Sequence, residues 1–226
     1  MAEVILALDL PTGSDAFRLL DRMLSLRWAK VGSVLMTREG PSFVRALVDR
    51  GLNVFLDLKW HDIPNTVAGA VAAARDGGVA MATVHTLGGS AMMQAAAREA
   101  GPGLGLVGVT VLTSHDPPGY ASATGREAVD LQAEVVRQCG NAMAAGLRGI
   151  VCSPLEVAAV RSVVADDAWV VVPGIRRARD ASGDQSRTAG PAEAVAAGAT
   201  HLVVGRPITA AADPAAALLE FQELAR

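Results

Sequence analysis

The chain reads Val54-Phe-Leu-Asp-Leu-Lys-Trp-His-Asp-Ile-Pro-Asn-Thr66 where a predicted buried strand gives way to the next element. The apolar run ends in Asp57 and Lys59, and charged groups at the end of a buried strand are costly unless they are paired or used. Strand alternation places these two side chains on the same face. Asp62 follows three residues later, so one ammonium has two carboxylates close to it in sequence. Such a cluster is either a structural salt bridge or the setting of a lysine that can donate a proton.

Short β-branched apolar runs recur on both sides of this stretch and alternate with Ala-rich amphipathic segments, the pattern of repeated βα units around a parallel sheet. Eight of these runs are predicted strands: residues 4–8, 29–31, 54–58, 81–84, 106–111, 149–151, 169–172 and 201–204. Eight units in roughly 220–250 residues predict one α/β domain, a single (β/α)8 TIM barrel over residues 1–226. A doubly wound sheet is the alternative. The alanine tracts 67–74 and 192–199 are expected to be helices.

The composition argues against several function classes. The residues are 51% hydrophobic and 4% aromatic, so the core is expected to consist of Ala, Val, Leu and Ile, and a net charge of -3 offers no field for nucleic acid. Residues 4–8 are too short for a signal sequence, and no segment approaches the ~20 apolar residues of a membrane span. Cys139 and Cys152 are too far apart for a C-x-x-C motif, and no zinc spacing is present. We therefore expect a soluble, cytoplasmic enzyme with no metal site.

Barrel enzymes place their chemistry at the carboxyl ends of the strands, so the polar residues there are candidate site residues. They are Asp9, Lys30, Asp57, Lys59, His85, Thr113, Ser114, Arg176 and Arg206. Asp9 could instead cap the following helix. Lys30 lies within a buried strand and is expected to pair with Asp57 or Asp9. His85 and His61 are expected to be packed structural histidines, not general bases.

The last two strand ends indicate an anion site. Gly205 and Arg206 follow the final strand, where many barrels bind phosphate. Gly205 would let the backbone approach the phosphate closely, and Arg206 could donate two hydrogen bonds to its oxygens. A surface arginine paired with an acid is the alternative. Residues 173–187 are hydrophilic and rich in polar side chains, which predicts a lid with Gln185 near its end, or else a plain solvated loop. Residues 114–120 are expected to form a second long loop. Residues 103–108 match G-x-G-x-x-G but precede a strand, so no dinucleotide site is expected.

Taken together, these segments resemble a known enzyme family. Four motifs occur in the family's order: D-x-K-x-x-D-I-P-N-T at 57–66, V-T-V-L-T-S at 109–114, P-G-I-R at 173–176 with D-Q-x-R at 184–187, and V-V-G-R-P-I-T at 203–209. Between residues 9 and 208 the chain is similar to the orotidine 5'-phosphate decarboxylases of the short bacterial type. The resemblance implies loss of CO₂ from C6 of orotidine 5'-phosphate to give UMP, with no metal or cofactor.

The resemblance also implies roles for individual residues. Lys59 would stabilise the carbanion and then supply the proton, while Asp57 would lie beside the departing carboxylate. Lys30 would join this array and, with Asp9, contact the sugar. The other implied substrate-binding residues are Ile63, Thr66, Thr113, Ser114, which faces the pyrimidine, Pro173, and the phosphate ligands Arg176, Gln185, Gly205 and Arg206.

Assembly follows from the same resemblance. In the family, Asp62, Ile63 and Thr66 reach into the neighbouring subunit, which implies a homodimer with shared active sites.

Two alternative functions stay open. A sugar-phosphate decarboxylase or aldolase of the same superfamily uses D-x-K-x-x-D with Mg²⁺, and the I-P-N-T continuation argues against it. A catalytically silent nucleotide-binding barrel is the other, and the intact Asp57, Lys59 and Asp62 argue against that.

Overall fold

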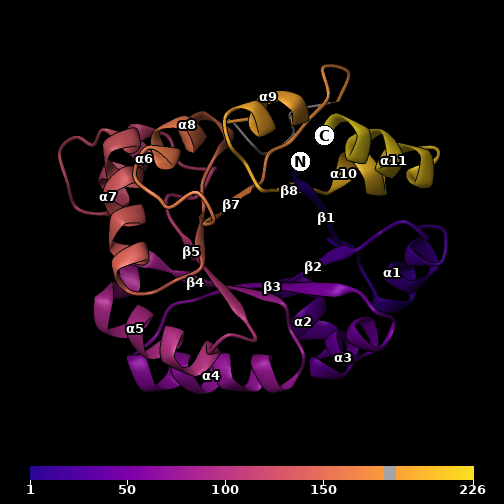
Figure 1. The fold of residues 1–226 in the computed structure, drawn as a ribbon, viewed down its shortest axis with the longest axis horizontal. Coiled ribbons are helices and arrows are strands. Elements are labelled where there is room, and N and C mark those ends of the chain that lie inside the picture. Colours follow the sequence, from indigo (N-terminus) through magenta and orange to yellow (C-terminus); the bar gives the residue numbers. More distant parts are fainter. Residues whose placement is uncertain (181–186) are drawn as a thin grey trace.

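The strands form one closed parallel barrel (Figure 1). A computed structural model describes residues 1–180 and 187–226. Within these residues each strand pairs with the next one along the chain, and β1 closes the barrel by pairing with β8. The strands are β1 (Glu3–Ala7), β2 (Trp28–Gly32), β3 (Asn53–Trp60), β4 (Met81–His85), β5 (Gly105–Val109), β6 (Gly149–Val151), β7 (Trp169–Val172) and β8 (His201–Val204). The predicted (β/α)8 barrel is confirmed, and the doubly wound alternative is wrong.

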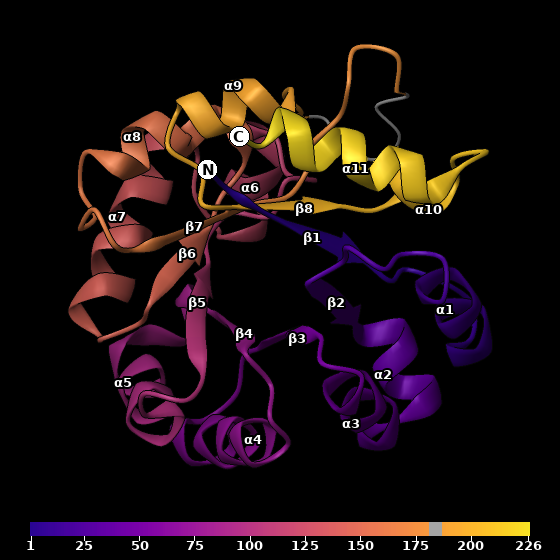
Figure 2. The same ribbon diagram turned by 45° about the vertical axis from the view of Figure 1, so that its right-hand side comes forward.

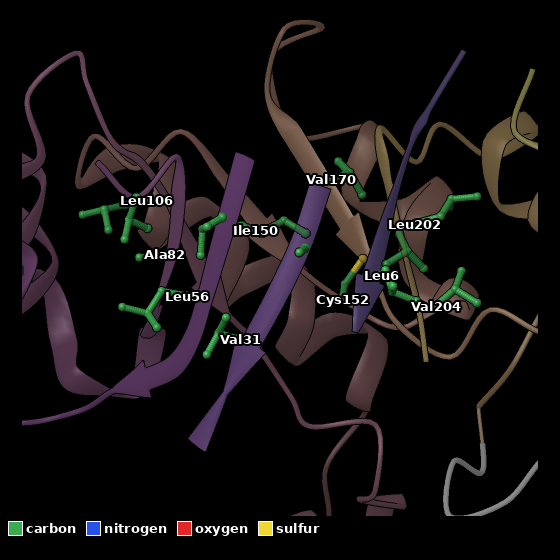
Figure 3. Packing of buried hydrophobic residues seen from close by; sticks show 14 of the residues in the cluster. Leu6, Val31, Leu56, Ala82, Leu106, Ile150, Cys152, Val170, Leu202 and Val204 are labelled. Atoms are coloured by element: carbon green, nitrogen blue, oxygen red, sulfur yellow. The ribbon is translucent and has the colours of Figure 1, made fainter. Parts of the chain in front are cut away.

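Side chains alternate along each strand between the inside of the barrel and the surrounding helices, because successive residues of a strand point to opposite faces. The inner cluster consists of Ile5, Ala7, Trp28, Phe55, Met81, Val107, Val171 and Val203. Leu6, Leu202 and Val204, which are sequence neighbours of inner residues, belong to the larger cluster between strands and helices (Figure 3). Burial on both faces explains why the strands read as continuous apolar runs.

Helices surround the barrel on its outside (Figure 1). They are α1 (Gly13–Leu20), α2 (Ser33–Glu39), α3 (Pro41–Asp49), α4 (Pro64–Asp76), α5 (Gly89–Ala100), α6 (Pro117–Ala123), α7 (Leu131–Ala144), α8 (Val157–Arg161), α9 (Pro191–Ala196), α10 (Arg206–Thr209) and α11 (Pro214–Leu224), with 3-10 turns η1 (Thr86–Gly88) and η2 (Pro154–Glu156). The expected alanine-rich helices correspond to α4 and α9. No helix of the described residues is long and apolar enough to cross a membrane.

The segment 114–120 contains the first turn of α6, so the prediction of a long loop there is wrong. Asp116 caps this helix by accepting a hydrogen bond from the Gly119 N–H at 2.8 Å. Pro117 occupies the first helical position, where its missing N–H costs nothing and its fixed φ suits the helix. The two prolines therefore start a helix in a segment that was expected to be irregular.

The amino-terminal end of the barrel is closed by the rings of Trp28, Trp169 and His201, whose centroids lie between 5.0 and 6.2 Å apart. A Cβ at Gly105 would lie 2.1 Å from the Trp169 ring, so β5 needs glycine beside this plug. Burial lowers the pKa of His201 to about 4, which leaves its ring uncharged at neutral pH. The chain ends also meet: the Ala2 N–H donates to the Ala225 carbonyl at 2.9 Å, beside β1 and α11 (Figure 2).

Candidate active site

A cavity of about 480 Å³ opens at the carboxyl ends of the strands, within the size range of small-molecule sites. Its floor is apolar and its rim is polar. The floor is formed by inward-facing residues of five strands: Ala7, Phe55, Val109, Val151 and Val203. The polar and charged residues of the rim are Asp9, Lys30, Asp57, Lys59, Thr113, Arg176, Arg206 and Thr209. Strand alternation produces this layering, since Asp9, Lys30 and Asp57 each lie two residues after an inward-facing apolar residue.

The rim carries a row of alternating charges. Lys30 Nζ lies 3.0 Å from Asp9 Oδ1 and 3.7 Å from Asp57 Oδ2. Lys59 Nζ lies 2.9 Å from both carboxylate oxygens of Asp57. The side chains of Lys30 and Asp57 are 10% and 14% exposed, whereas that of Lys59 is 40% exposed. Both ends of the row, Asp9 at 65% and Lys59 at 40% side-chain exposure, therefore face solvent, while Lys30 and Asp57 between them are mostly buried.

The backbone at Lys59 departs from regular strand geometry. β3 pairs with β4 through Leu56 and Ala82, then through Trp60 and Val84, so β3 has three residues where β4 has one. Lys59 has a φ of 51°, and no other non-glycine residue of the described ranges has a positive φ. The expectation that Asp57 and Lys59 lie on the same face is confirmed, since the two side chains meet and both line the cavity. The irregular backbone between them is a feature that alternation does not predict.

The segment after the array points away from it. His61, Asp62, Ile63 and the residues up to Thr66 are exposed, and none of them lines the cavity. The Asp62 carboxylate accepts the N–H of its neighbour Ile63 at 2.6 Å and forms no ion pair within the described part of the chain. Within one chain, the structure does not join Asp62 to Lys59.

The other predicted site residues divide into three groups. Thr113, Pro173, Arg176, Gly205 and Arg206 line the cavity, while Ser114 lies outside its lining. Gln185, with the predicted lid around it, falls outside the described residues.

The structure also decides whether Asp9 caps the helix that follows it. Asp9 does not cap the next helix, because Thr12 does, accepting the Asp15 N–H at 3.1 Å. The turn after β8 contains the short helix α10 that phosphate-binding barrels often have.

The two histidines near the array stack on each other, with centroids 5.4 Å apart. Burial first, and then the nearby His61 and Lys59, lower the pKa of His85 to about 4. Its Nδ1 accepts the Leu87 N–H at 3.3 Å at the start of η1, so His85 is the structural histidine that the sequence predicts. His61 is exposed but stacks on His85, so the prediction that it lies on the packing side of the turn agrees with the structure at this one contact and not in burial.

Thr83 of β4 is a neighbour of the array that the sequence reasoning missed. It is fully buried, and its hydroxyl contacts both Asp57 and the Lys59 backbone. Strand alternation could have found it, because Met81 faces the inside of the barrel and Thr83 is the next inward position. No group of three or more His, Cys, Asp or Glu side chains in residues 1–180 and 187–226 is placed to hold a metal ion.

Comparison with known proteins gives one consistent result. Residues 2–221 match the model of the orotidine 5'-phosphate decarboxylase / HUMPS family. Orotidine 5'-phosphate decarboxylase of Alkalilimnicola ehrlichii is 52% identical, with 98% of this chain and 95% of the relative covered. That of Halorhodospira halophila is 50% identical over 95% of this chain and 92% of its own. The crystal structure of the Lactobacillus acidophilus enzyme superposes with a TM-score of 0.89 over all of both chains, at 33% identity.

Proposed function

The chain belongs to the orotidine 5'-phosphate decarboxylase / HUMPS family, and we propose that it converts orotidine 5'-phosphate to UMP and CO₂ with its own side chains, without metal or cofactor. It is a carboxy-lyase, since relatives that share 52% and 50% of its residues are orotidine 5'-phosphate decarboxylases. Family membership places this reaction in pyrimidine biosynthesis. The proposed mechanism rests on one observation: Lys59 Nζ is held 2.9 Å from both oxygens of Asp57 at the cavity rim.

Lys59 would act on the charge that forms at C6. When the bond between C6 and the carboxylate breaks, its electron pair stays on carbon, and a nearby ammonium stabilises that developing charge electrostatically. An ammonium has three hydrogens, and two of those of Lys59 are directed to Asp57, which leaves one for the cavity. Transfer of that proton to C6 would complete UMP, and the resulting amine would regain a proton from water.

Asp57 and Lys30 would prepare the site for this step. Asp57 would orient Lys59 and lie beside the substrate carboxylate as it leaves. Lys30 lies between Asp57 and Asp9, so one ammonium is shared by the two carboxylates. With its remaining donors Lys30 could contact the ribose hydroxyls, together with the 65% exposed Asp9 side chain.

The phosphate would bind at the carboxyl ends of β7 and β8, at Gly205, Arg206 and Arg176. A Cβ at Gly205 would lie 3.5 Å from Ala7 Cβ, an ordinary contact, so the space around Gly205 does not by itself require glycine there. A phosphate bound close to the backbone of Gly205 would supply a reason for glycine at this position. Binding energy from this remote group speeds the reaction where it is used to assemble the site around C6. Gln185 stays a predicted phosphate ligand outside the described residues, and Thr113, Ser114 and Pro173 stay predicted substrate contacts.

We further propose a homodimer in which Asp62, Ile63 and Thr66 complete the partner's site. Six consecutive exposed residues follow Trp60, and Ile63 is 67% exposed although it is strongly apolar. Such a segment is suited to burial in an interface. A two-fold interface would make the exchange reciprocal, so each site would combine Lys59 of one chain with Asp62 of the other.

Complementation between inactive variants tests this shared site. Lys59→Ala and Asp62→Ala chains, unfolded together and refolded, should give about half heterodimers, each with one native site and one doubly altered site. About a quarter of all sites would then be native, and activity should return to about a quarter of wild type. Each variant refolded alone, and refolded wild type, are the controls. A mixture as inactive as its parents would mean that Asp62 serves its own chain.

The reaction itself is tested by following the ultraviolet absorbance of orotidine 5'-phosphate after mixing with the protein. Decarboxylation changes the chromophore, whereas a silent nucleotide-binding barrel would leave it unchanged. Prior chelation with EDTA should have no effect, while activity lost to EDTA and restored by Mg²⁺ would favour the sugar-phosphate alternative. We also propose that residues 1–226 act as one domain, since the first and last strands pair with each other. The cytoplasmic location stays a prediction.

A further inference from the structure

The hydroxyl of Thr83 links the backbone of Lys59 to the carboxylate of Asp57. The Lys59 N–H donates to Thr83 Oγ1 at 2.8 Å, and Thr83 Oγ1 donates to Asp57 Oδ1 at 3.1 Å. A backbone N–H can only donate, so the hydroxyl must accept at that contact, and its own hydrogen is left for the carboxylate. The direction of both bonds is therefore determined by chemistry.

This link lies where the strand ladder is interrupted. Between the pairs Leu56–Ala82 and Trp60–Val84, three residues of β3 face the single residue Thr83. The extra residues take the Lys59 N–H out of the regular ladder, and its φ of 51° is unfavourable for a residue with a Cβ. A conformation of this kind persists only where its surroundings hold it. The Thr83 hydroxyl is the group that receives the displaced N–H.

We infer that Thr83 is a positioning residue for the decarboxylation, because its hydroxyl holds the Lys59 backbone and the Asp57 carboxylate in the geometry that aims the ammonium at the reacting carbon. Thr83 is 0% exposed and does not line the cavity, so it acts through the other two residues. This inference rests on the proposed role of Lys59. Asp57 Oδ1 receives both the Thr83 hydroxyl and the Lys59 ammonium, so rotation of this carboxylate would displace the proton donor.

Two substitutions separate the hydroxyl from the bulk of the side chain. Thr83→Val keeps the shape and removes both hydrogen bonds, whereas Thr83→Ser keeps the hydroxyl. Thr86→Val is the matched control, since Thr86 is also buried and follows β4 directly. Its hydroxyl lies 2.9 Å from the Val109 carbonyl and 2.7 Å from Gln138 Oε1, away from the array.

We expect Thr83→Val to lower kcat by about 10- to 100-fold, the scale of a small misplacement of a catalytic group. UMP affinity should stay at the wild-type level, because Lys59 acts on charge that exists only in the transition state. Thr83→Ser should restore most of kcat. Thr86→Val should lower the melting temperature and leave kcat unchanged. If Thr83→Val folds poorly, Thr83→Ala removes the same hydroxyl without the added methyl.

Several results would overturn the inference. Wild-type kcat in Thr83→Val would do so, as would equal kcat losses in Thr83→Val and Thr86→Val, or a serine variant as slow as the valine. A wild-type protein that does not decarboxylate orotidine 5'-phosphate would instead refute the proposed function. A crystal structure of Thr83→Val tests the geometry independently of activity: Lys59 should have moved from Asp57, and an ion pair unchanged at 2.9 Å would refute the positioning role.

Discussion

Two mostly buried carboxylates, Asp57 at the barrel mouth and Glu134 on α7, each lie beside two cationic side chains. Asp57 is 14% exposed and pairs with Lys30 and Lys59, while Glu134 is 4% exposed and pairs with Arg126 and Arg137. The ingredients are alike, but Asp57, Lys30 and Lys59 line the cavity at the barrel mouth, whereas Glu134 and its arginines do not. The comparison shows what distinguishes a reactive ion cluster from a structural one.

The Glu134 cluster is saturated. Its carboxylate accepts hydrogen bonds from Arg126, Arg137, Tyr120 and Gln138 at distances between 2.6 and 3.1 Å. The hydrogen bonds from Arg137 are the largest cause of a Glu134 pKa lowered to about 2. Two arginines present rigid forks that match a carboxylate, so the donors of this cluster converge on one acceptor. It ties α6 to α7 and fills the acceptor sites of the Glu134 carboxylate.

The Asp57 cluster uses lysines, and the Lys59 ammonium makes two hydrogen bonds to Asp57, which leaves one of its three donors for another partner. The Lys59 side chain is 40% exposed and faces a cavity with an apolar floor and a charged rim. The electrostatic interaction between a charge at this position and a bound substrate is strong, because the surroundings are less polar than water. A carboxylate whose acceptor sites are all filled by hydrogen bonds therefore has a structural role. An ion cluster that keeps a donor facing a cavity can instead contact a ligand.

Lys59→Ala should give the largest effect and is the strongest test of this contrast. We expect turnover of orotidine 5'-phosphate to fall by several orders of magnitude while UMP still binds, because the ammonium stabilises only the transition state. Arg137→Ala, which removes a cation from the Glu134 cluster, should lower stability without lowering kcat. Absorbance assays would measure turnover, UMP titration would measure binding, and urea unfolding would measure stability. Near-native turnover in Lys59→Ala would rule out the proposed mechanism.

Arg206→Ala sharpens the comparison, since Arg206 is an arginine that lines the cavity, whereas Arg126 and Arg137 lie outside its lining. We expect a loss of ~2–4 kcal/mol of transition-state stabilisation with the phosphorylated substrate, the range for losing one partner of a close charge pair. The dephosphorylated nucleoside should react almost equally with both proteins. Measuring kcat/KM for each substrate decides the matter, and equal losses on both would assign Arg206 to the fold.

Glu134→Gln should have the smallest effect and should act on stability alone. Replacing the ionised acceptor should cost ~1–3 kcal/mol at neutral pH, the scale for hydrogen bonds to a charged group. The folded pKa lies below the ordinary 4.5, so this stabilisation is present above pH 4.5 and is lost as the pH falls toward 2. Urea midpoints of both proteins should therefore converge in acid, with kcat unchanged. A constant difference at every pH, or a loss of kcat, would contradict this role.

Much of the site follows from the order of residues along the chain. Eight apolar runs predict the barrel, and a parallel barrel brings all carboxyl strand ends to one rim, so the sequence alone is enough to group Asp9, Lys30, Asp57 and Arg206. Three strands, β6, β7 and β8, have the predicted bounds. Local patterns succeed here because alternation and turn residues are properties of short segments.

The sequence by itself determined the barrel, the polar rim and the motifs of the family. Only the tertiary structure decided the left-handed backbone of Lys59, the link that the Thr83 hydroxyl makes between Lys59 and Asp57, and the exposed position of Asp62. These features depend on how β3 pairs with β4, the next strand along the chain, whose register shifts between Leu56 and Trp60. No local pattern encodes that shift, because it results from hydrogen bonds and packing that exist only once both strands are in the closed barrel.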